Sequence, residues 1–231
     1  MKSHHSISRI ASSLLLLPLL LFAPGCSPGG NAGRTGSVED IDGNHYGTVT
    51  IGGRTWMSEN LRVSRYRNGD PIPEVRDARN WSGSGSGAWS VYEHREGNGK
   101  TYGKIYNWHA VNDPRGLAPK GWHVATDREW TELAESTGGE EHAGSALKAP
   151  GKWRGAATAA SNASGFDALP AGARRDTDGA FVLLGEFARF WTSTGSDKER
   201  AYGRAMEYYD GALRRGEVKK ENGFSVRCVR D

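Results

Sequence analysis

Short runs of apolar residues, separated by glycine-containing turns, dominate the pattern between residue 41 and the C-terminus. Residues 48–57 read TVTIGGRTWM and residues 202–218 read YGRAMEYYDGALRRGEV. Gly-Gly and Asp-Gly pairs readily adopt the left-handed backbone of tight hairpin turns, so both stretches predict β-hairpins. A third hairpin turn is predicted at the Asp-Gly pair 178–179. Further strands are predicted at 180–184, 187–192 and 224–230.

Helical periodicity is clearest at residues 127–136. Trp130, Leu133 and Ala134 stand at i, i+3 and i+4, and a glycine pair ends the run. Residues 141–149 and 106–111 predict two shorter helices. The pattern as a whole predicts an α+β fold, a single compact domain of short antiparallel strands with two or three short helices and long loops.

The longest predicted loop spans residues 68–101 and is rich in Gly, Ser and Pro, including SGSGSG. It nevertheless carries three aromatic residues, Trp81, Trp89 and Tyr92. Loops of this length are commonly functional or disordered. Two interpretations are open: the rings fold back onto the core, or they form a contact surface for a sugar ring or a protein partner.

The first 25 residues predict a secretory signal peptide. Lys2 and Arg9 precede an apolar run at 10–23, which is shorter than the roughly 20 residues of a membrane-spanning helix. The run ends in Ala-Pro-Gly followed by Cys26, which resembles the lipobox of bacterial lipoproteins, where the cysteine is lipidated. The alternative is ordinary secretion with Cys26 as an unmodified thiol.

These features predict an exported, membrane-anchored lipoprotein, in the outer membrane or at the cell surface. Residues 26–40 contain little apolar surface and are expected to form a flexible tether. Residues 41–231 are expected to form the domain. The membrane, reached through the lipid on Cys26, is thus the first predicted partner.

The charge balance bears on nucleic-acid binding, and the cysteine content bears on disulfide formation. The chain has 30 Lys and Arg against 27 Asp and Glu, without a basic stripe, so nucleic acid is not predicted as a partner. Besides Cys26 the chain contains only Cys228, and no disulfide is expected in the domain. Cys228 alternates with Phe224 and Val226, which predicts a buried, unreactive thiol.

The stretch GWHVATDREW, residues 121–130, places a histidine and two carboxylates close together. Thr126 followed by Glu129 directly before an apolar run is a capping box, and Asp127 would occupy the first helical turn. Helix initiation therefore explains both carboxylates. His123 and His109 each adjoin a tryptophan but lack metal-ligand spacing, so we expect them to form hydrogen bonds beside an aromatic layer.

Other catalytic and metal-binding patterns are incomplete or missing from the sequence. There is no G-x-S-x-G, P-loop or H-E-x-x-H motif. Residues 40–44, DIDGN, match only the beginning of a calcium loop and predict a turn. We therefore predict no catalytic residue, no metal ligand and no cofactor.

Six segments, in order, resemble the Fibrobacter succinogenes major paralogous domain. They are DIDGNHYGTVTIGGRTWMSENL (40–61), YGKIYNWHAV (102–111), APKGWHVATDREWTEL (118–133), GFDALPAG (165–172), FWTST (190–194) and GFSVRCVRD (223–231). The resemblance covers nearly all of the expected domain. It implies an exported bacterial protein, often a lipoprotein, but no particular reaction.

A more distant resemblance connects HVATDREW and GFSVRCV with the formylglycine-generating enzymes, whose fold is C-type-lectin-like. That resemblance implies a compact scaffold carrying a long loop region. The catalytic cysteine pair of those enzymes has no counterpart, because Cys228 stands alone in the domain. The fold is therefore expected without the copper chemistry.

Two functions remain. The first is a non-catalytic, lipid-anchored cell-envelope binding or structural module, which binds a glycan or a surface protein through the 68–101 loop. The second is an exported hydrolase acting on polysaccharide, which a concave pocket holding two carboxylates with raised pKa would favour.

Overall fold

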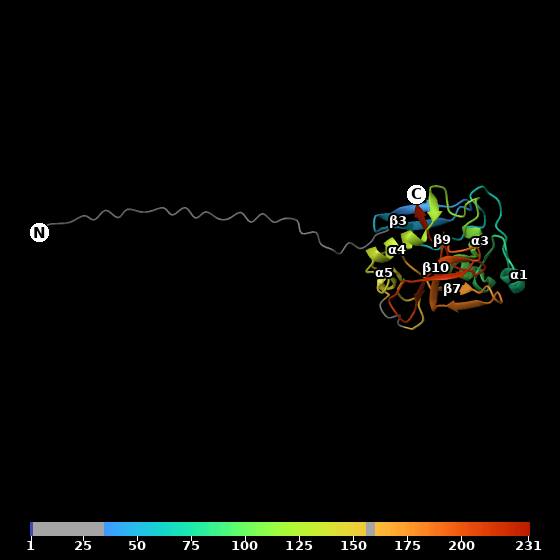
Figure 1. Cartoon of the computed structure of the whole chain (residues 1–231). Helices are drawn as coiled ribbons and strands as arrows, with labels where there is room; N and C mark the ends of the chain where they lie inside the picture. The colour runs from blue at the N-terminus through green and yellow to red at the C-terminus, as the bar shows by residue number, and fades with distance from the viewer. Residues whose placement is uncertain (2–34, 156–159) are drawn as a thin grey trace. The chain divides into compact units, whose positions relative to one another are not determined.

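Two five-stranded sheets and one two-stranded sheet form the framework of the domain (Figure 1). The structure is a computed structural model that describes Met1, residues 35–155 and residues 160–231. The predicted signal peptide, apart from Met1, and Cys26 lie outside the described residues. Residues 35–155 and 160–231 group into one unit. The coarse prediction is confirmed, because the unit consists mostly of β-sheet with few, short helices.

The first sheet has the order β1-β2-β3-β12-β6, with every neighbouring pair antiparallel. The predicted hairpin at 48–57 is confirmed as β2 and β3, which Gly52 and Gly53 join with φ of 58° and 80°. The last residues of the segment predicted as a flexible tether form β1 at the sheet edge, so the sheet includes residues before position 41. The strands are β1 (Gly36–Glu39), β2 (His45–Ile51), β3 (Arg54–Met57), β6 (Trp122–Val124) and β12 (Cys228–Arg230).

The second sheet has the order β11-β10-β9-β7-β8, antiparallel except where β7 pairs with β9. The hairpin predicted over 202–218 is confirmed as β10 and β11, and the strand predicted at 187–192 is confirmed within β9. The third predicted hairpin is β7 and β8. The strands are β7 (Ala171–Arg174), β8 (Phe181–Leu184), β9 (Phe187–Gly195), β10 (Arg200–Glu207) and β11 (Arg214–Lys219). The small sheet pairs β4 (Trp89–Ser90) with β5 (Ile105–Tyr106).

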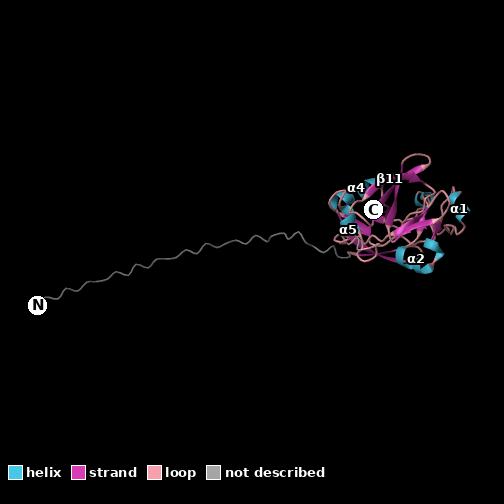
Figure 2. Ribbon diagram, turned by 90° about the horizontal axis from the view of Figure 1, so that it is seen from below, coloured by secondary structure: helices cyan, strands magenta, loops and turns pink. Residues whose placement is uncertain are grey.

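Short helices lie around the outside of the strands (Figure 2). The best-predicted helix is confirmed in full as α4 (Asp127–Ser136), and the weaker ones appear as shorter helices. None of the helices in the described ranges is both long and apolar enough to cross a membrane. The others are α1 (Ala78–Ser82), η1 (Tyr92–His94), α2 (Glu96–Tyr102), α3 (Trp108–Val111) and α5 (Ala143–Leu147).

An aromatic cluster joins α4 to both sheets. Trp130 of α4 lies 5.2 Å from Trp56 of β3 and 5.1 Å from Phe190 of β9, measured between ring centroids. Phe166 completes the cluster at 5.5 Å from Trp130. All four rings are fully buried, and such edge-to-face and tilted contacts add to the free energy gained by burial. The helical stripe predicted from the sequence is therefore the contact between helix and sheets.

Buried cations hold several loops through main-chain carbonyl groups. Arg174 donates to the carbonyls of residues 75–77 and 179, and its guanidinium lies 4.5 Å from the Trp81 ring centroid. Arg227 donates to the carbonyls of residues 57, 166 and 167 and to Asn60. Lys148 donates to those of residues 207 and 210. Dense hydrogen bonding of this kind is what makes a buried charge tolerable.

The C-terminal segment, predicted as one strand over 224–230, is a regular strand only in β12, at its last residues before Asp231. Residues 223, 224 and 225 instead form single bridges, to Arg174, Tyr106 and Phe190 respectively. Arg227 lies between the apolar positions and is itself fully buried, so the segment is enclosed on both sides rather than on one. Cys228 is a free, buried thiol, as predicted, and burial raises its pKa well above the ordinary value.

Candidate functional site

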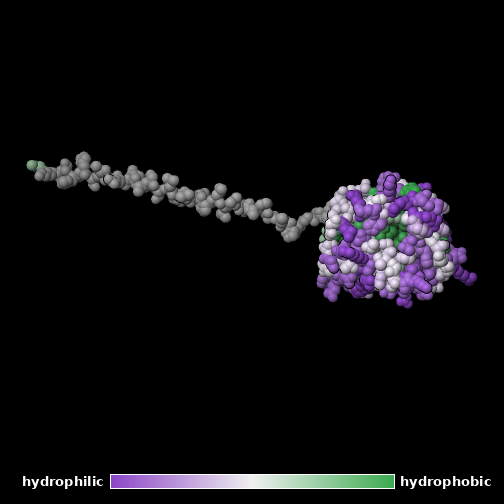
Figure 3. Space-filling view, turned by 45° about the horizontal axis from the view of Figure 1, so that its top comes forward, coloured by the Kyte–Doolittle hydropathy of each residue, from purple (hydrophilic) through white to green (hydrophobic). Residues whose placement is uncertain are grey.

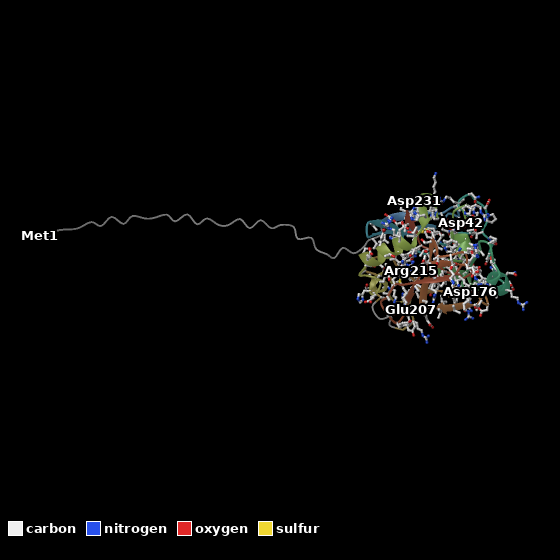
Figure 4. All side chains as sticks on the ribbon, viewed as in Figure 1. Met1, Asp42, Asp176, Glu207, Arg215 and Asp231 are labelled. Atoms are coloured by element: carbon white, nitrogen blue, oxygen red, sulfur yellow. The ribbon has the colours of Figure 1, made fainter. Side chains whose placement is uncertain are left out.

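A groove of about 1120 Å³ lies beside Trp89, large enough for a small-molecule or oligosaccharide ligand. Three chain segments line it: the turn at 40–44, the stretch 62–76 and the stretch 89–104. The lining side chains are mostly charged or polar, and they are Asp42, Asn44, Arg62, Ser64, Arg65, Pro71, Ile72, Glu74, Arg76, Trp89, Val91, His94, Glu96, Lys100 and Lys104, with Gly99. Figure 4 labels Asp42, and Figure 3 shows hydrophilic residues framing a smaller apolar area on one face of the molecule.

The turn at 40–44 is held by the carboxylate of Asp40. It accepts hydrogen bonds from the main-chain N–H of Asp42 at 2.9 Å and of Asn44 at 3.0 Å, and from the Tyr46 hydroxyl at 2.6 Å. The predicted turn is thus confirmed. Asp42 then projects into the groove, where it accepts from Arg65 Nε at 2.6 Å.

Trp89 is the one predicted contact residue that lines the groove. Its main chain is fixed by pairing with β5 and by hydrogen bonds to Pro73 and Val75. The indole Nε1 donates to the Ile72 carbonyl at 2.8 Å, which fixes the ring, and the residue is partly buried against the core and partly exposed. The Lys104 ammonium lies 3.7 Å from the ring centroid, in cation–π contact.

The other two predicted contact residues are corrected by the structure. Trp81 is 0% exposed and Tyr92 is 7% exposed, so neither ring is available to a partner. Both pack with Ile105 and Ala88 in a small apolar cluster. The 68–101 segment can bury them because it folds into α1, β4, η1 and most of α2, and Arg174 caps the Trp81 ring. Trp81 and Tyr92 therefore fold back onto the core, which was the first of the two interpretations of the loop aromatics.

One wall of the groove contains left-handed backbone at two residues that are not glycine. Glu93 has φ of 52° and His94 has φ of 55°. Such conformations cost free energy in residues with a Cβ and occur often at functional sites. His94 lines the groove, and burial, together with the positive charges of Arg174 and Arg76, lowers its pKa.

Each carboxylate of the groove already has a cationic partner. Asp42 binds Arg65, Glu74 binds Arg76 at 3.0 Å, and Glu96 binds Lys100 at 2.7 Å. Burial opposes ionisation of Asp42, but hydrogen bonds from Arg65 and the Ser64 N–H hold its pKa below the ordinary value. Lys100 likewise lowers the pKa of Glu96. Neither has the raised pKa of a general acid, so no observation here favours the hydrolase hypothesis.

The acidic residues at the start of α4 have the structural roles predicted for them. The Thr126 hydroxyl accepts from the Glu129 N–H at 3.2 Å, and the Glu129 carboxylate accepts from the Thr126 N–H at 2.8 Å. Asp127 bridges two arginines, the buried Arg204 at 2.7 Å and Arg215 at 2.8 Å. Arg215 is labelled in Figure 4. The carboxylates therefore start the helix and bind it to β10 and β11.

His123 lies between two carboxylates. Its Nδ1 is 2.7 Å from Asp231 Oδ1, and its Nε2 is 2.9 Å from Glu129 Oε1. Although burial opposes protonation, these hydrogen bonds raise its pKa above the ordinary value. Because both ring nitrogens are engaged, the imidazole has no free position to act as a base or a metal ligand. His109 lies apart from this cluster, and its Nε2 is 3.7 Å from Glu221 Oε1.

Within residues 35–155 and 160–231, no group of three or more His, Cys, Asp and Glu side chains is arranged to hold a metal ion.

Sequence reasoning missed the cationic residues of the groove. Lys104 stands in YGKIYNWH, where nothing local distinguishes it from a solvated surface lysine. Only the pairing of β4 with β5 brings it to Trp89. Arg62 and His94 were missed for the same reason, because their proximity is set by long-range contacts.

Comparison with known proteins gives one match. The family model of the Fibrobacter succinogenes major domain matches residues 49–230. No curated protein and no solved structure matches the chain.

Proposed function

The chain belongs to the Fibrobacter succinogenes major domain family, and on the geometry of the groove we propose that it is a non-catalytic, lipid-anchored binding module of the cell envelope that binds carbohydrate beside Trp89. The partly exposed tryptophan in a polar groove carries this proposal. The apolar C–H groups of a sugar ring pack against aromatic surface, while its hydroxyls require polar neighbours.

The distribution of charge favours a saccharide over a protein partner. Sugar hydroxyls both donate and accept hydrogen bonds, and the groove alternates carboxylates with guanidinium and ammonium groups that hold each other in place. Protein-binding hot spots, in contrast, are centred on apolar and aromatic side chains depleted of charge. Only four apolar residues line this groove, namely Pro71, Ile72, Trp89 and Val91.

The location forms part of the same proposal. The signal peptide and the lipobox-like sequence before Cys26 support export and lipid anchoring, at the outer membrane or the cell surface. A tethered domain in that position would meet extracellular glycans. We also propose a C-type-lectin-like architecture, which the long 62–104 stretch of short elements on a framework of sheets supports.

Binding of the full-length chain, solubilised in detergent, to an array of neutral and charged oligosaccharides tests this function. Trp89→Ala should weaken binding about tenfold, the effect of losing one aromatic contact. Tyr209→Ala, which removes an exposed aromatic ring outside the groove, is the matched control and should change nothing. If the wild-type protein binds no saccharide, or Trp89→Ala binds as well as wild type, the proposal is wrong. Capture of a protein instead would point to an envelope-protein partner.

A further inference from the structure

Two cations of the groove have no carboxylate partner among the described residues. Five cationic and three acidic side chains line the groove, and Arg65, Arg76 and Lys100 are each paired with one of the acids. The remaining two are Lys104 and Arg62. The groove therefore has an excess of positive charge whose position is defined by these two residues.

Lys104 is held in an unusual environment for an ammonium group. Its Nζ donates to the Ser64 hydroxyl and lies over the Trp89 ring, and both of these neighbours are neutral. Asp42, Asp40 and Glu74 are close enough to act through space, but none forms a salt bridge with it in the part of the chain that the structure describes. Burial, which outweighs these charges, lowers the Lys104 pKa to about 8.

Arg62 has a similar set of neutral neighbours. Its Nη2 donates to the His45 carbonyl at 2.8 Å, its Nε to the Asn44 side chain at 3.3 Å, and its guanidinium stacks over Tyr46. A guanidinium has five N–H donors, so these contacts leave donors that can face a ligand. An anion in the groove would thus meet one point charge and one planar donor group.

We propose that the groove binds an acidic saccharide, with the carboxylate of a uronic acid residue placed at Lys104 and Arg62 and the sugar ring against Trp89. The inference rests on the proposed function and specifies its ligand class. A neutral sugar would leave the partly dehydrated ammonium without a counter-charge, whereas a carboxylate would supply one where screening by water is reduced.

Titration calorimetry of the full-length chain in detergent provides the test, with tetragalacturonate as the acidic probe and its carboxyl-reduced, neutral counterpart as the comparison. The acidic probe should bind about tenfold or more tightly than the neutral one at about pH 7, as expected for a charge-assisted contact. Lys104→Met, which keeps a stem of similar length over Trp89, should reduce this difference severalfold, with Arg62 left as the remaining cation at the carboxylate. Lys152→Met removes an exposed lysine outside the groove and should bind like wild type.

The pH dependence separates Lys104 from a general charge effect. Raising the pH from about 7 to about 9.5 should weaken wild-type binding of the acidic probe, because the ammonium loses its proton near pH 8 while the neighbouring carboxylates stay ionised. Lys104→Arg should retain its affinity across this range. A sulfated galactan fragment, run in parallel, shows whether the site distinguishes carboxylate from another anion.

The outcomes are distinct. Equal affinity for acidic and neutral probes, or a Lys104→Met protein that is folded by its melting curve and prefers the acid as strongly as wild type, overturns the inference. In the first case Trp89-dependent binding of the neutral sugar would leave the proposed function standing. Preference for the sulfated probe over the carboxylated one would overturn the uronic acid assignment. Absence of binding to any saccharide overturns both proposals.

Discussion

Trp81 and Trp89 come from the same Gly- and Ser-rich segment but have opposite environments. Trp81 is fully buried under the Arg174 guanidinium, and Trp89 is partly exposed in the groove. Trp81→Ala should therefore lower the free energy of unfolding by about 3–5 kcal/mol, as expected for a large ring removed from a core. Trp89→Ala should cost clearly less. Denaturant unfolding of the two variants measures the difference, and equal losses would contradict the assignment of Trp89 to the groove.

The hydrogen bond between Asp231 and His123 should appear in the titration of the imidazole. Asp231→Asn removes one of the two carboxylates that stabilise the protonated ring, so the His123 pKa should fall. Histidine NMR resonances followed against pH measure this shift, with the other histidines as internal controls. A His123 pKa that is unchanged in the variant would show that Asp231 does not interact with it in solution.

The same pair predicts a stability effect with a defined sign. A histidine whose pKa is raised on folding contributes stability below its unfolded pKa of about 6.5, and loses it as the pH rises through the folded value. Asp231→Asn should therefore destabilise the protein at about pH 5.5 and have no effect at about pH 9. Because Asp231 and His123 are both considerably exposed, the difference should be only a few tenths of a kcal/mol.

The capping box at the start of α4 is an interaction of a whole element, since it satisfies the first free N–H groups of the helix. Thr126→Ala should lower the free energy of unfolding by about 1 kcal/mol, the typical cost of a lost N-cap. Arg128→Ala, on the exposed face of the same helix, removes only a surface pair with Glu132 and should cost much less. Thermal or denaturant unfolding compares the two, and equal costs would contradict the capping role.

The left-handed backbone of η1 gives a prediction about glycine. Inside ordinary helices alanine is more stable than glycine, but at Glu93 the positive φ reverses that order. Glu93→Gly should be more stable than Glu93→Ala by about 1 kcal/mol, since both variants lose the exposed pair with Arg95 equally. Chemical denaturation of both variants decides the sign. A more stable alanine variant would mean that the wall relaxes to another conformation.

Elements set by local chemistry could be predicted from the sequence, and those set by distant contacts could not. The α4 helix has its cap, apolar stripe and glycine stop within one short stretch, and the β2–β3 hairpin has its turn residues between its strands. In contrast, α2 contains two glycines and lacks a side-chain cap, so its propensity is poor and tertiary packing determines it. The bridges of residues 223–225 likewise depend on partners far away in the chain.

The candidate site divides in the same way. Trp89 could be selected because an aromatic residue in a polar segment is unusual, but Trp81 and Tyr92 met the same criterion and are buried. What separates them is contact with the second sheet: Arg174 lies over Trp81, and Phe181 packs against Tyr92, although no local pattern connects either residue with this segment. Burial of a loop aromatic is therefore a property of the packed molecule, not of the segment that carries it.

At the scale of the whole molecule, lipid anchoring gives the last prediction. Cys26→Ser should move the protein from the membrane fraction to the soluble exported fraction and abolish incorporation of labelled fatty acid, because the near-neutral domain has no other proposed attachment. Cys228→Ala is the control, since that thiol is buried in the core and should not be acylated. A Cys26→Ser protein that remains membrane-bound and labelled would refute the lipoprotein proposal.

The buried cations of the fold donate hydrogen bonds to main-chain carbonyls, and this allows the amino-acid sequence of the loops to vary. Every amino acid, whatever its side chain, offers the same carbonyl group, so side chains outside the core, such as those at 76 and 210, can be exchanged while Arg174 and Lys148 keep their acceptors. Residue 76 is one of these positions, and its side chain lines the groove. The position of a loop thus depends on its main-chain carbonyls, whereas the surface that it offers to a ligand depends on its side chains. One framework can therefore carry different binding surfaces.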